Sequence, residues 1–210
     1  VGMETYRRLR EKLSASPTGV PEGDDFLEIL SILFTGAEAL LALTVPFMPA
    51  PLEEIASSAG LDVEEAERHL SNMANKGVVY AFEKSGTKMF MLFDIVWVLF
   101  KFPLMTKLPG IDYHRLKSLW NKYLAEGIGG NGKPMPEGRQ IPMGRVIPIQ
   151  EEIPNKTEAL PQDLVYKYID EAKCISVGQC SCKSTMRACN SPTEVCMALN
   201  YEAQFLVDRG

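Results

Sequence analysis

The sequence predicts a mainly α-helical fold with a small β component, joined to a short cysteine-rich segment. Three observations carry this prediction. Apolar residues recur at helical spacing through the first half, one polar turn separates two short β-like runs, and all five cysteines fall within residues 174–196. The 210 residues allow one large domain or two small ones. With 46% apolar and 23% charged residues, the composition is globular.

Apolar periodicity predicts three helices in the first part of the chain. They are expected at residues 26–45, 52–59 and 62–76. Asp24 or Asp25 can cap the first helix, Gly60 ends the second, and Asp62 caps the third. A β-hairpin follows, with strands at residues 78–83 and 88–93 around a polar turn.

Three helices followed by a hairpin is the element order of a winged-helix domain. A DNA-reading third helix would offer basic or amide side chains near its N-terminus, whereas this one begins with acidic residues. The acidic side chains are Asp62, Glu64, Glu65 and Glu67, with Arg68 and His69 beyond them. Lys76, Lys84 and Lys88 are expected to form a scattered, solvated face. The net charge of −5 also disfavours nucleic-acid binding, so we expect a docking or homodimerisation module.

The most apolar stretch, residues 89–105, is too short and too interrupted to span a membrane. We expect it to be the second hairpin strand running into a buried helix. Further helices are predicted at residues 113–125 and 160–172, and a strand at residues 145–149.

Glycine and proline accumulate after residue 126 and predict a break between domains. The predicted organisation is a winged-helix-like domain with additional helices at 1–126, a linker at 127–144, and a cysteine-rich segment at 145–210. Neither His69 nor His114 has partners for catalysis, and adjacent carboxylates point apart on a helix. We therefore expect no catalytic residues of the hydrolase kind.

The cysteines follow the spacing Cys174-x5-Cys180-x-Cys182-x6-Cys189-x6-Cys196. Thiolates are soft ligands for zinc or iron–sulfur centres, and either centre normally takes four. Zinc ribbons usually place about two to four residues between paired cysteines, so the single residue between Cys180 and Cys182 favours an iron–sulfur centre.

Polar neighbours of the cysteines are expected to tune such a centre. Hydroxyl groups can donate hydrogen bonds to sulfur, and basic side chains can offset thiolate charge. The expected hydroxyl donors are Ser181, Ser184, Thr185 and Ser191, and the expected cations are Lys183 and Arg187.

The segment from Arg145 onward, containing "CISVGQCSCKSTMRACNSPTEVCMAL", resembles a group of iron–sulfur proteins from anaerobic microbes. Their members join an N-terminal winged-helix-like region to a Cys-x-Cys…Cys…Pro-x-x-x-Cys segment, and commonly to a C-terminal ferredoxin module of the two-[4Fe–4S] type. The resemblance implies that Cys180, Cys182, Cys189 and Cys196 bind a [4Fe–4S] cluster. Cys174 lies outside the motif and is expected to be a packed or spare thiol.

Two departures from the family pattern matter. Lys183 stands where the family often has arginine, so a bidentate contact there becomes a point charge. The chain also stops at Gly210, before any ferredoxin module, so we expect either a fragment or a protein that works without that part.

The resulting hypothesis is an electron-transfer protein or redox-complex subunit, an electron carrier rather than a stand-alone enzyme. It would exchange electrons with a redox partner protein in a reducing cytoplasm, without a transmembrane segment. Two alternatives remain open: a redox-sensing winged-helix transcription regulator, and an interaction protein with a structural zinc site.

Overall fold

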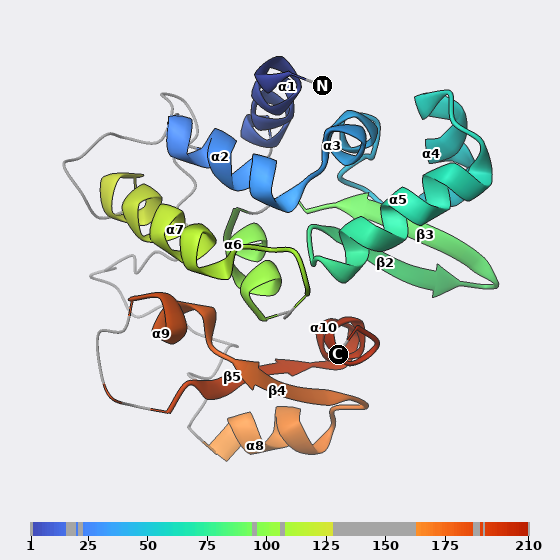
Figure 1. Ribbon diagram of the computed structural model, residues 1–210. Helices are drawn as coiled ribbons and strands as arrows, with labels where there is room; N and C mark the ends of the chain where they lie inside the picture. Colours follow the sequence, from blue (N-terminus) through green and yellow to red (C-terminus); the bar gives the residue numbers. More distant parts are fainter. Residues whose placement is uncertain are drawn as a thin grey trace, which may run out of the picture.

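A computed structural model describes residues 2–15, 20, 23–93, 96–105, 108–127, 163–186, 190 and 192–209. As predicted, this part of the chain is mainly α-helical with a small β component (Figure 1). Its helices are α1 (Met3–Ser14), α2 (Asp24–Leu33), α3 (Gly36–Ala42), α4 (Leu52–Ala59), α5 (Val63–Asn75), α6 (Val96–Met105), α7 (Tyr113–Gly127), α8 (Asp163–Asp170), α9 (Ser181–Met186) and α10 (Asn200–Val207). Its strands are β1 (Ala50–Pro51), β2 (Val79–Lys84), β3 (Thr87–Leu92), β4 (Ile175–Gln179) and β5 (Glu194–Leu199).

The single helix predicted over residues 26–45 is wrong, because α2 and α3 are separate helices. Phe34 is extended between them, with φ −118° and ψ 128°. Thr35 then caps α3, since its side chain accepts a hydrogen bond from the Glu38 amide while the Glu38 carboxylate accepts one from the Thr35 amide. This reciprocal capping box satisfies two amides at the start of a helix. Its Thr-x-x-Glu pattern was visible in the sequence.

Helix α1 was not predicted, and it stabilises the end of α3. The Lys12 amine donates hydrogen bonds to the carbonyls of Ala42, Leu43 and Val45, at 3.0, 2.8 and 2.5 Å. A cation at this place satisfies carbonyls that the helix leaves unpaired and opposes the negative end of its dipole.

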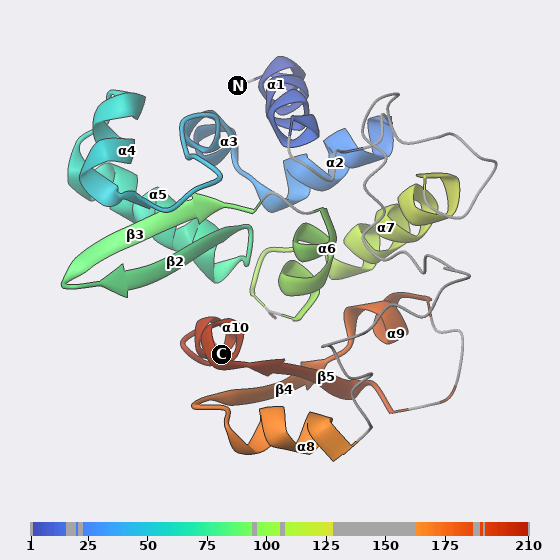
Figure 2. The ribbon, with the colours of Figure 1, turned by 180° about the vertical axis from the view of Figure 1, so that it is seen from behind.

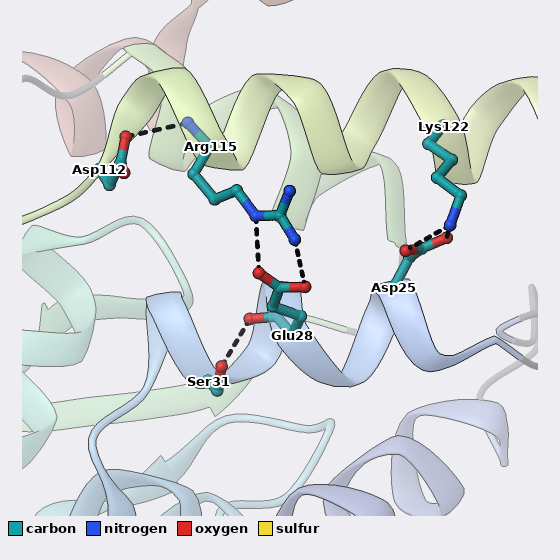
Figure 3. A network of polar contacts seen from close by, with 6 residues as sticks. All are labelled: Asp25, Glu28, Ser31, Asp112, Arg115 and Lys122. Atoms are coloured by element: carbon teal, nitrogen blue, oxygen red, sulfur yellow. Dashed lines mark hydrogen bonds and ion pairs between the residues drawn. The ribbon is translucent and has the colours of Figure 1, made fainter.

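Helices α2 and α7 lie side by side and are linked by two ion pairs (Figure 3). The Arg115 guanidinium donates two hydrogen bonds of 2.7 Å to the Glu28 carboxylate, and Lys122 pairs with Asp25 at 2.9 Å. The same two helices also meet through Phe26, which stacks on Tyr123 with ring centroids 5.2 Å apart. The apolar contact drives the packing, and the paired charges set the alignment of the two helices.

The three-stranded sheet has the order β1-β3-β2, with both pairings antiparallel. Helices α4 and α5 pack against each other beside it (Figures 1 and 2). Asp62 caps α5 as predicted, accepting a hydrogen bond of 2.8 Å from the Glu65 amide. The hairpin prediction is also confirmed, with Ser85 and Gly86 in its tight turn at positive φ.

The expectation that Lys76 is solvated is wrong. Its amine lies 2.6 Å from the carboxylate of Glu38, whose side chain is 2% exposed. This ion pair joins α3 to the end of α5, and Glu38 also accepts the Thr35 amide. A carboxylate this deeply buried is stable only with such partners.

Helix α6 fulfils the expectation of a buried helix after the second hairpin strand. Phe100, Phe102 and Leu104 on this helix are all buried. Pro103 lies inside the helix rather than ending it. Within the described residues, no helix is long and apolar enough to cross a membrane.

Gly77 allows α6 to approach the end of α5. It has φ +72°, and a Cβ atom built there would lie 2.7 Å from the Cβ of Phe102. Glycine therefore serves two purposes here, because it adopts a left-handed conformation and leaves room for the neighbouring helix.

The C-terminal segment packs against the N-terminal part through aromatic rings. Phe205 of α10 lies 4.9 Å from the ring of Tyr80 and 5.6 Å from that of Phe102, measured between centroids. Phe93 completes this buried group, and the Tyr80 hydroxyl donates to the Tyr201 carbonyl at 3.2 Å. Figures 1 and 2 show α10 and α9 facing the N-terminal elements, with α8 on the far side of β4 and β5.

The helices predicted in the second half of the chain are present. The one predicted over residues 113–125 is α7, and the one predicted over residues 160–172 is α8. The predicted strand at residues 145–149 lies outside the described residues, as does the linker beyond Gly127. The division into domains at this linker stays a prediction.

Replacing Gly77 by alanine is expected to destabilise the fold by about 3 kcal/mol, the sum of left-handed strain and overpacking against Phe102. Gly60→Ala is the matched control, since Gly60 has φ +66° but open space around it. This control should cost only about 1 kcal/mol. Urea unfolding measures both losses, and equal losses would contradict the close approach of α6.

Lys76→Met is expected to cost about 3 kcal/mol, because it leaves the Glu38 carboxylate buried without its cation. Glu38→Gln added to this variant should recover part of the loss. Lys88→Met breaks the exposed pair with Glu67 and should cost less than about 1 kcal/mol. Thermal unfolding compares the three variants, and an equal cost for Lys76→Met and Lys88→Met would show that burial of the pair is unimportant.

Candidate thiolate site

The candidate site is built on the hairpin of β4 and β5. Cys196 in β5 pairs with Gly178 of β4, next to a register irregularity between Gly178 and Gln179. Cys180 follows β4 directly, and its amide donates a hydrogen bond of 2.6 Å to the Thr193 carbonyl. Helix α9 begins at the next residue and carries Cys182 in its first turn. Strand pairing and a tight strand-to-helix step therefore bring three motif cysteines to one end of the hairpin.

The three thiols interact with one another. The charges of Cys180 and Cys196 act on Cys182, and the charge of Cys180 acts on Cys196, so the three thiols lie near one another. Partial burial raises the pKa of the Cys182 thiol, and the charges of Cys180 and Cys196 raise it further. Burial also raises the pKa of Cys196, which the positive charge of Lys101 opposes. The thiolates of Cys182 and Cys196 are therefore disfavoured, and a bound cation would relieve this electrostatic cost.

Cys174 lies at the other end of the hairpin, where its carbonyl accepts a hydrogen bond of 2.8 Å from the Asn200 amide. Cys174 precedes Gly178, the partner of Cys196, by four positions along the extended chain, which corresponds to about 13 Å. The structure thus separates Cys174 from the other described cysteines. Cys189, the remaining motif cysteine, lies outside the described residues, as do Arg187 and Ser191.

The hydroxyl groups do not all serve as expected. The Ser181 hydroxyl donates to the Lys101 carbonyl at 2.7 Å, and that of Ser184 donates to the Ser181 carbonyl at 3.3 Å. A hydroxyl has one proton to donate, so neither is available to sulfur in this arrangement. The hydroxyl of Thr185 is buried and has no hydrogen-bond partner within the described residues, which leaves it able to donate.

Lys101 of α6 is a charged side chain near the thiols that the cysteine motif did not indicate. Its amine forms an ion pair with Glu202 of α10, and both charges act on the Cys196 thiol. Lys183, the cation expected from the sequence, instead donates to the Pro192 carbonyl at 3.4 Å. The only hint of Lys101 was a lone lysine within an apolar helix, a position that usually requires a partner.

The described cysteines supply donor atoms of the kind that metal sites use. No disulfide joins Cys174, Cys180, Cys182 or Cys196, so these thiols are available as ligands. Within the described residues, no group of three or more His, Cys, Asp or Glu side chains is arranged so that it could hold a metal ion, and this includes Cys180, Cys182 and Cys196. The donor set is nevertheless soft and thiol-rich, which suits iron–sulfur or zinc centres. Three thiols need one further ligand for either kind of centre.

The raised pKa of Cys182 predicts slow alkylation of this exposed thiol in metal-free protein. Thiolate is the reactive form, so its reaction with iodoacetamide should continue to accelerate as the pH rises beyond about 9. The Cys180→Ala variant removes one cause of the raised pKa of Cys182. Alkylation of Cys182 in this variant should therefore begin to accelerate at a lower pH. Mass spectrometry of the Cys182 peptide follows both reactions, and identical pH profiles would contradict the interaction between the two thiols.

Comparisons with known proteins do not identify a relative. No family model, curated protein or solved structure matches this chain.

Proposed function

We propose that this chain binds an iron–sulfur cluster, of the [4Fe–4S] type, and acts as an electron carrier or as a subunit of a redox complex. The observation that carries the proposal is the convergence of Cys180, Cys182 and Cys196 at one end of the hairpin, away from Cys174. Cys189 is proposed as the fourth ligand from its place in the motif. The bound cluster would supply one-electron exchange.

The exposure of the individual cysteines would determine from which side a partner protein can approach such a centre. Cys182 is exposed, whereas Cys180 and Cys196 are only partly accessible, so the Cys182 side of the site is the more open one. Electron transfer between proteins requires close approach to the redox centre, and we propose that a redox partner protein docks on this side. The Ser181 hydroxyl donates a hydrogen bond to the Lys101 carbonyl and so links the segment between two of the proposed ligands to α6.

We further propose that the N-terminal part is a winged-helix-like docking module. The pairing of β1 with β3, beside α4 and α5, supports this assignment. The charges favour a protein partner over DNA. Glu65 pairs with Arg68 at 3.8 Å, and Lys88 pairs with Glu67, so nearby basic side chains are already engaged by carboxylates. Carboxylates at the start of α5 would repel DNA phosphates.

The deciding experiment is anaerobic purification or reconstitution of the chain, followed by iron, sulfide and zinc analysis. We expect about four iron atoms and about four sulfide ions per chain, with an absorbance band at about 400 nm. About one zinc and no iron would instead support the structural zinc alternative. Salt-dependent, cluster-dependent binding to a specific DNA duplex would favour the redox-sensing regulator.

Cys182→Ala is expected to abolish most of the iron and the visible absorbance, because it removes a ligand. Cys174→Ala is the matched control, since Cys174 lies in the same hairpin but at its opposite end. That variant should retain the iron content of the unmodified chain. Equal loss of iron from both variants would show that the ligand assignment is wrong.

A further inference from the structure

We propose that the open edge of β2 is a binding site for an extended peptide, which adds to the sheet as an antiparallel strand and places its C-terminal carboxylate on Arg209. The inference goes beyond the proposed function, because this site contains no cysteine and does not depend on a bound cluster. It starts from a cavity of about 280 Å³ that lies between α5, the hairpin of β2 and β3, and the residues that follow α10.

The cavity runs along the edge of β2. The strand order β1-β3-β2 leaves one side of β2 without a neighbouring strand among the described residues. Ala81, Phe82 and Glu83 are consecutive in β2, and all three line the cavity. Successive side chains of a strand point to opposite faces of the sheet, so a cavity that touches three in a row passes along the strand edge rather than over one face.

The main-chain groups of this edge are oriented to bind another strand. The Leu92 amide donates a 2.8 Å hydrogen bond to the Pro46 carbonyl, and it therefore points away from β2. Its register partner Val79 must then direct its own N–H and C=O away from β3. This orientation recurs at every second residue of an antiparallel pair, so the N–H and C=O groups of Ala81 and Glu83 also point to the open edge. In the described part of the chain, no other backbone group bonds to them.

Arg209 supplies a cation to the cavity. Its guanidinium carbon lies 4.1 Å from the centroid of the Phe205 ring, and its Nη1 donates a hydrogen bond of 3.0 Å to the Phe205 carbonyl. Its Nε is buried without a hydrogen-bond partner, and none of the ion pairs formed by the described residues includes it. A half-buried guanidinium with unused donors favours a planar carboxylate, which can accept two parallel N–H bonds.

The position of Arg209 indicates the direction of the peptide. Arg209 lies near the beginning of β2, since its ring partner Phe205 packs on Tyr80. Figures 1 and 2 likewise show α10 beside the beginning of β2, while the hairpin turn extends away from it. A peptide that runs antiparallel to β2 ends at this same place, so its terminal carboxylate meets the guanidinium. A parallel peptide would bring its terminal ammonium group there instead.

The other charges of the cavity indicate a peptide with one carboxylate and a cation upstream of it. Glu67 and Lys88 line the cavity and pair with each other. Glu83 is exposed nearer the turn and belongs to none of the ion pairs of the described residues, so a basic side chain of the peptide can pair with it. Three strand residues span about 10 Å, which places this cation about three residues before the carboxylate. Asp208 also lines the cavity and disfavours a doubly charged phosphate.

An NMR titration of the full, metal-free, ¹⁵N-labelled chain tests the proposal. The probe is an N-acetylated tetrapeptide of one lysine followed by three valines, with a free C-terminal carboxylate. We expect it to shift the amide signals of Ala81 and Glu83. The same peptide with a C-terminal amide should bind several-fold more weakly, because it lacks the charge that Arg209 recognises. If these signals do not shift, or if the amidated peptide binds equally well, the proposal is wrong.

A second probe separates a peptide strand from a free small carboxylate. Acetylvaline carries the carboxylate but cannot pair along β2, so we expect it to bind several-fold more weakly than the tetrapeptide. Equal binding of the two would show that the cavity takes small carboxylates, and it would overturn the assignment of a peptide strand.

Two variants and one control separate the contributions of charge and strand pairing. Arg209→Gln should abolish the preference for the free carboxylate, so that both tetrapeptides bind equally. Arg68→Gln is the matched control, because Arg68 lies on α5 but pairs with Glu65 outside the cavity, and it should retain the preference. Ala81→Pro removes an outward-pointing amide, leaves the hydrogen bonds between β2 and β3 intact, and should weaken binding of both tetrapeptides.

The outcomes of these variants decide the proposal independently of the iron–sulfur function. A carboxylate preference that persists in Arg209→Gln would overturn the role of Arg209, and full binding by Ala81→Pro would overturn the pairing with β2. None of these measurements requires a cluster. A failure here is therefore distinguishable from a failure of the iron–sulfur proposal, which the metal analysis decides.

Discussion

The packing of α6 between the two parts of the chain is the interaction on which the rest of the structure depends. Three consecutive side chains of this helix have three different tasks. Phe100 packs on Trp120 in the main core, with ring centroids 5.4 Å apart. Phe102 contacts Phe205 in the second aromatic group, and Lys101 pairs with Glu202 beside the thiols. Successive helix positions face different directions, so one short helix can contact all three regions.

This arrangement makes the thiolate site part of the fold rather than an independent appendage. A two-stranded hairpin is marginally stable alone, so β4 and β5 need a surface on which to pack. The aromatic contacts of Phe205 and the hydrogen bond from Ser181 to α6 supply that surface. The C-terminal segment that carries the site also contacts the β2–β3 hairpin, because Phe205 packs against Tyr80.

Local signals predicted the regular elements well where they were strong. The boundaries of α4 and the cap of α5 followed from Gly60 and Asp62, because these residues act on their own neighbours in the chain. The boundary between α2 and α3 was missed because apolar periodicity was given more weight than the capping box at Thr35. The solvated role expected for Lys76 was wrong because its partner Glu38 lies far away in the sequence. Long-range ion pairs leave no local pattern.

The sequence by itself determined which chemistry is available to this protein. Cysteine spacing is a property of the chain, and the resemblance of that spacing to the pattern of the iron–sulfur proteins is what sets Cys174 apart from the other four cysteines. Only the tertiary structure decided which charges surround the thiols, placing Lys101 and Glu202 beside Cys196 and directing the Ser181 hydroxyl to a backbone carbonyl. The physical reason is that electrostatic interactions act through space. Lys101 and Glu202 are distant along the chain and meet only because aromatic packing seats α10 on α6 and β2.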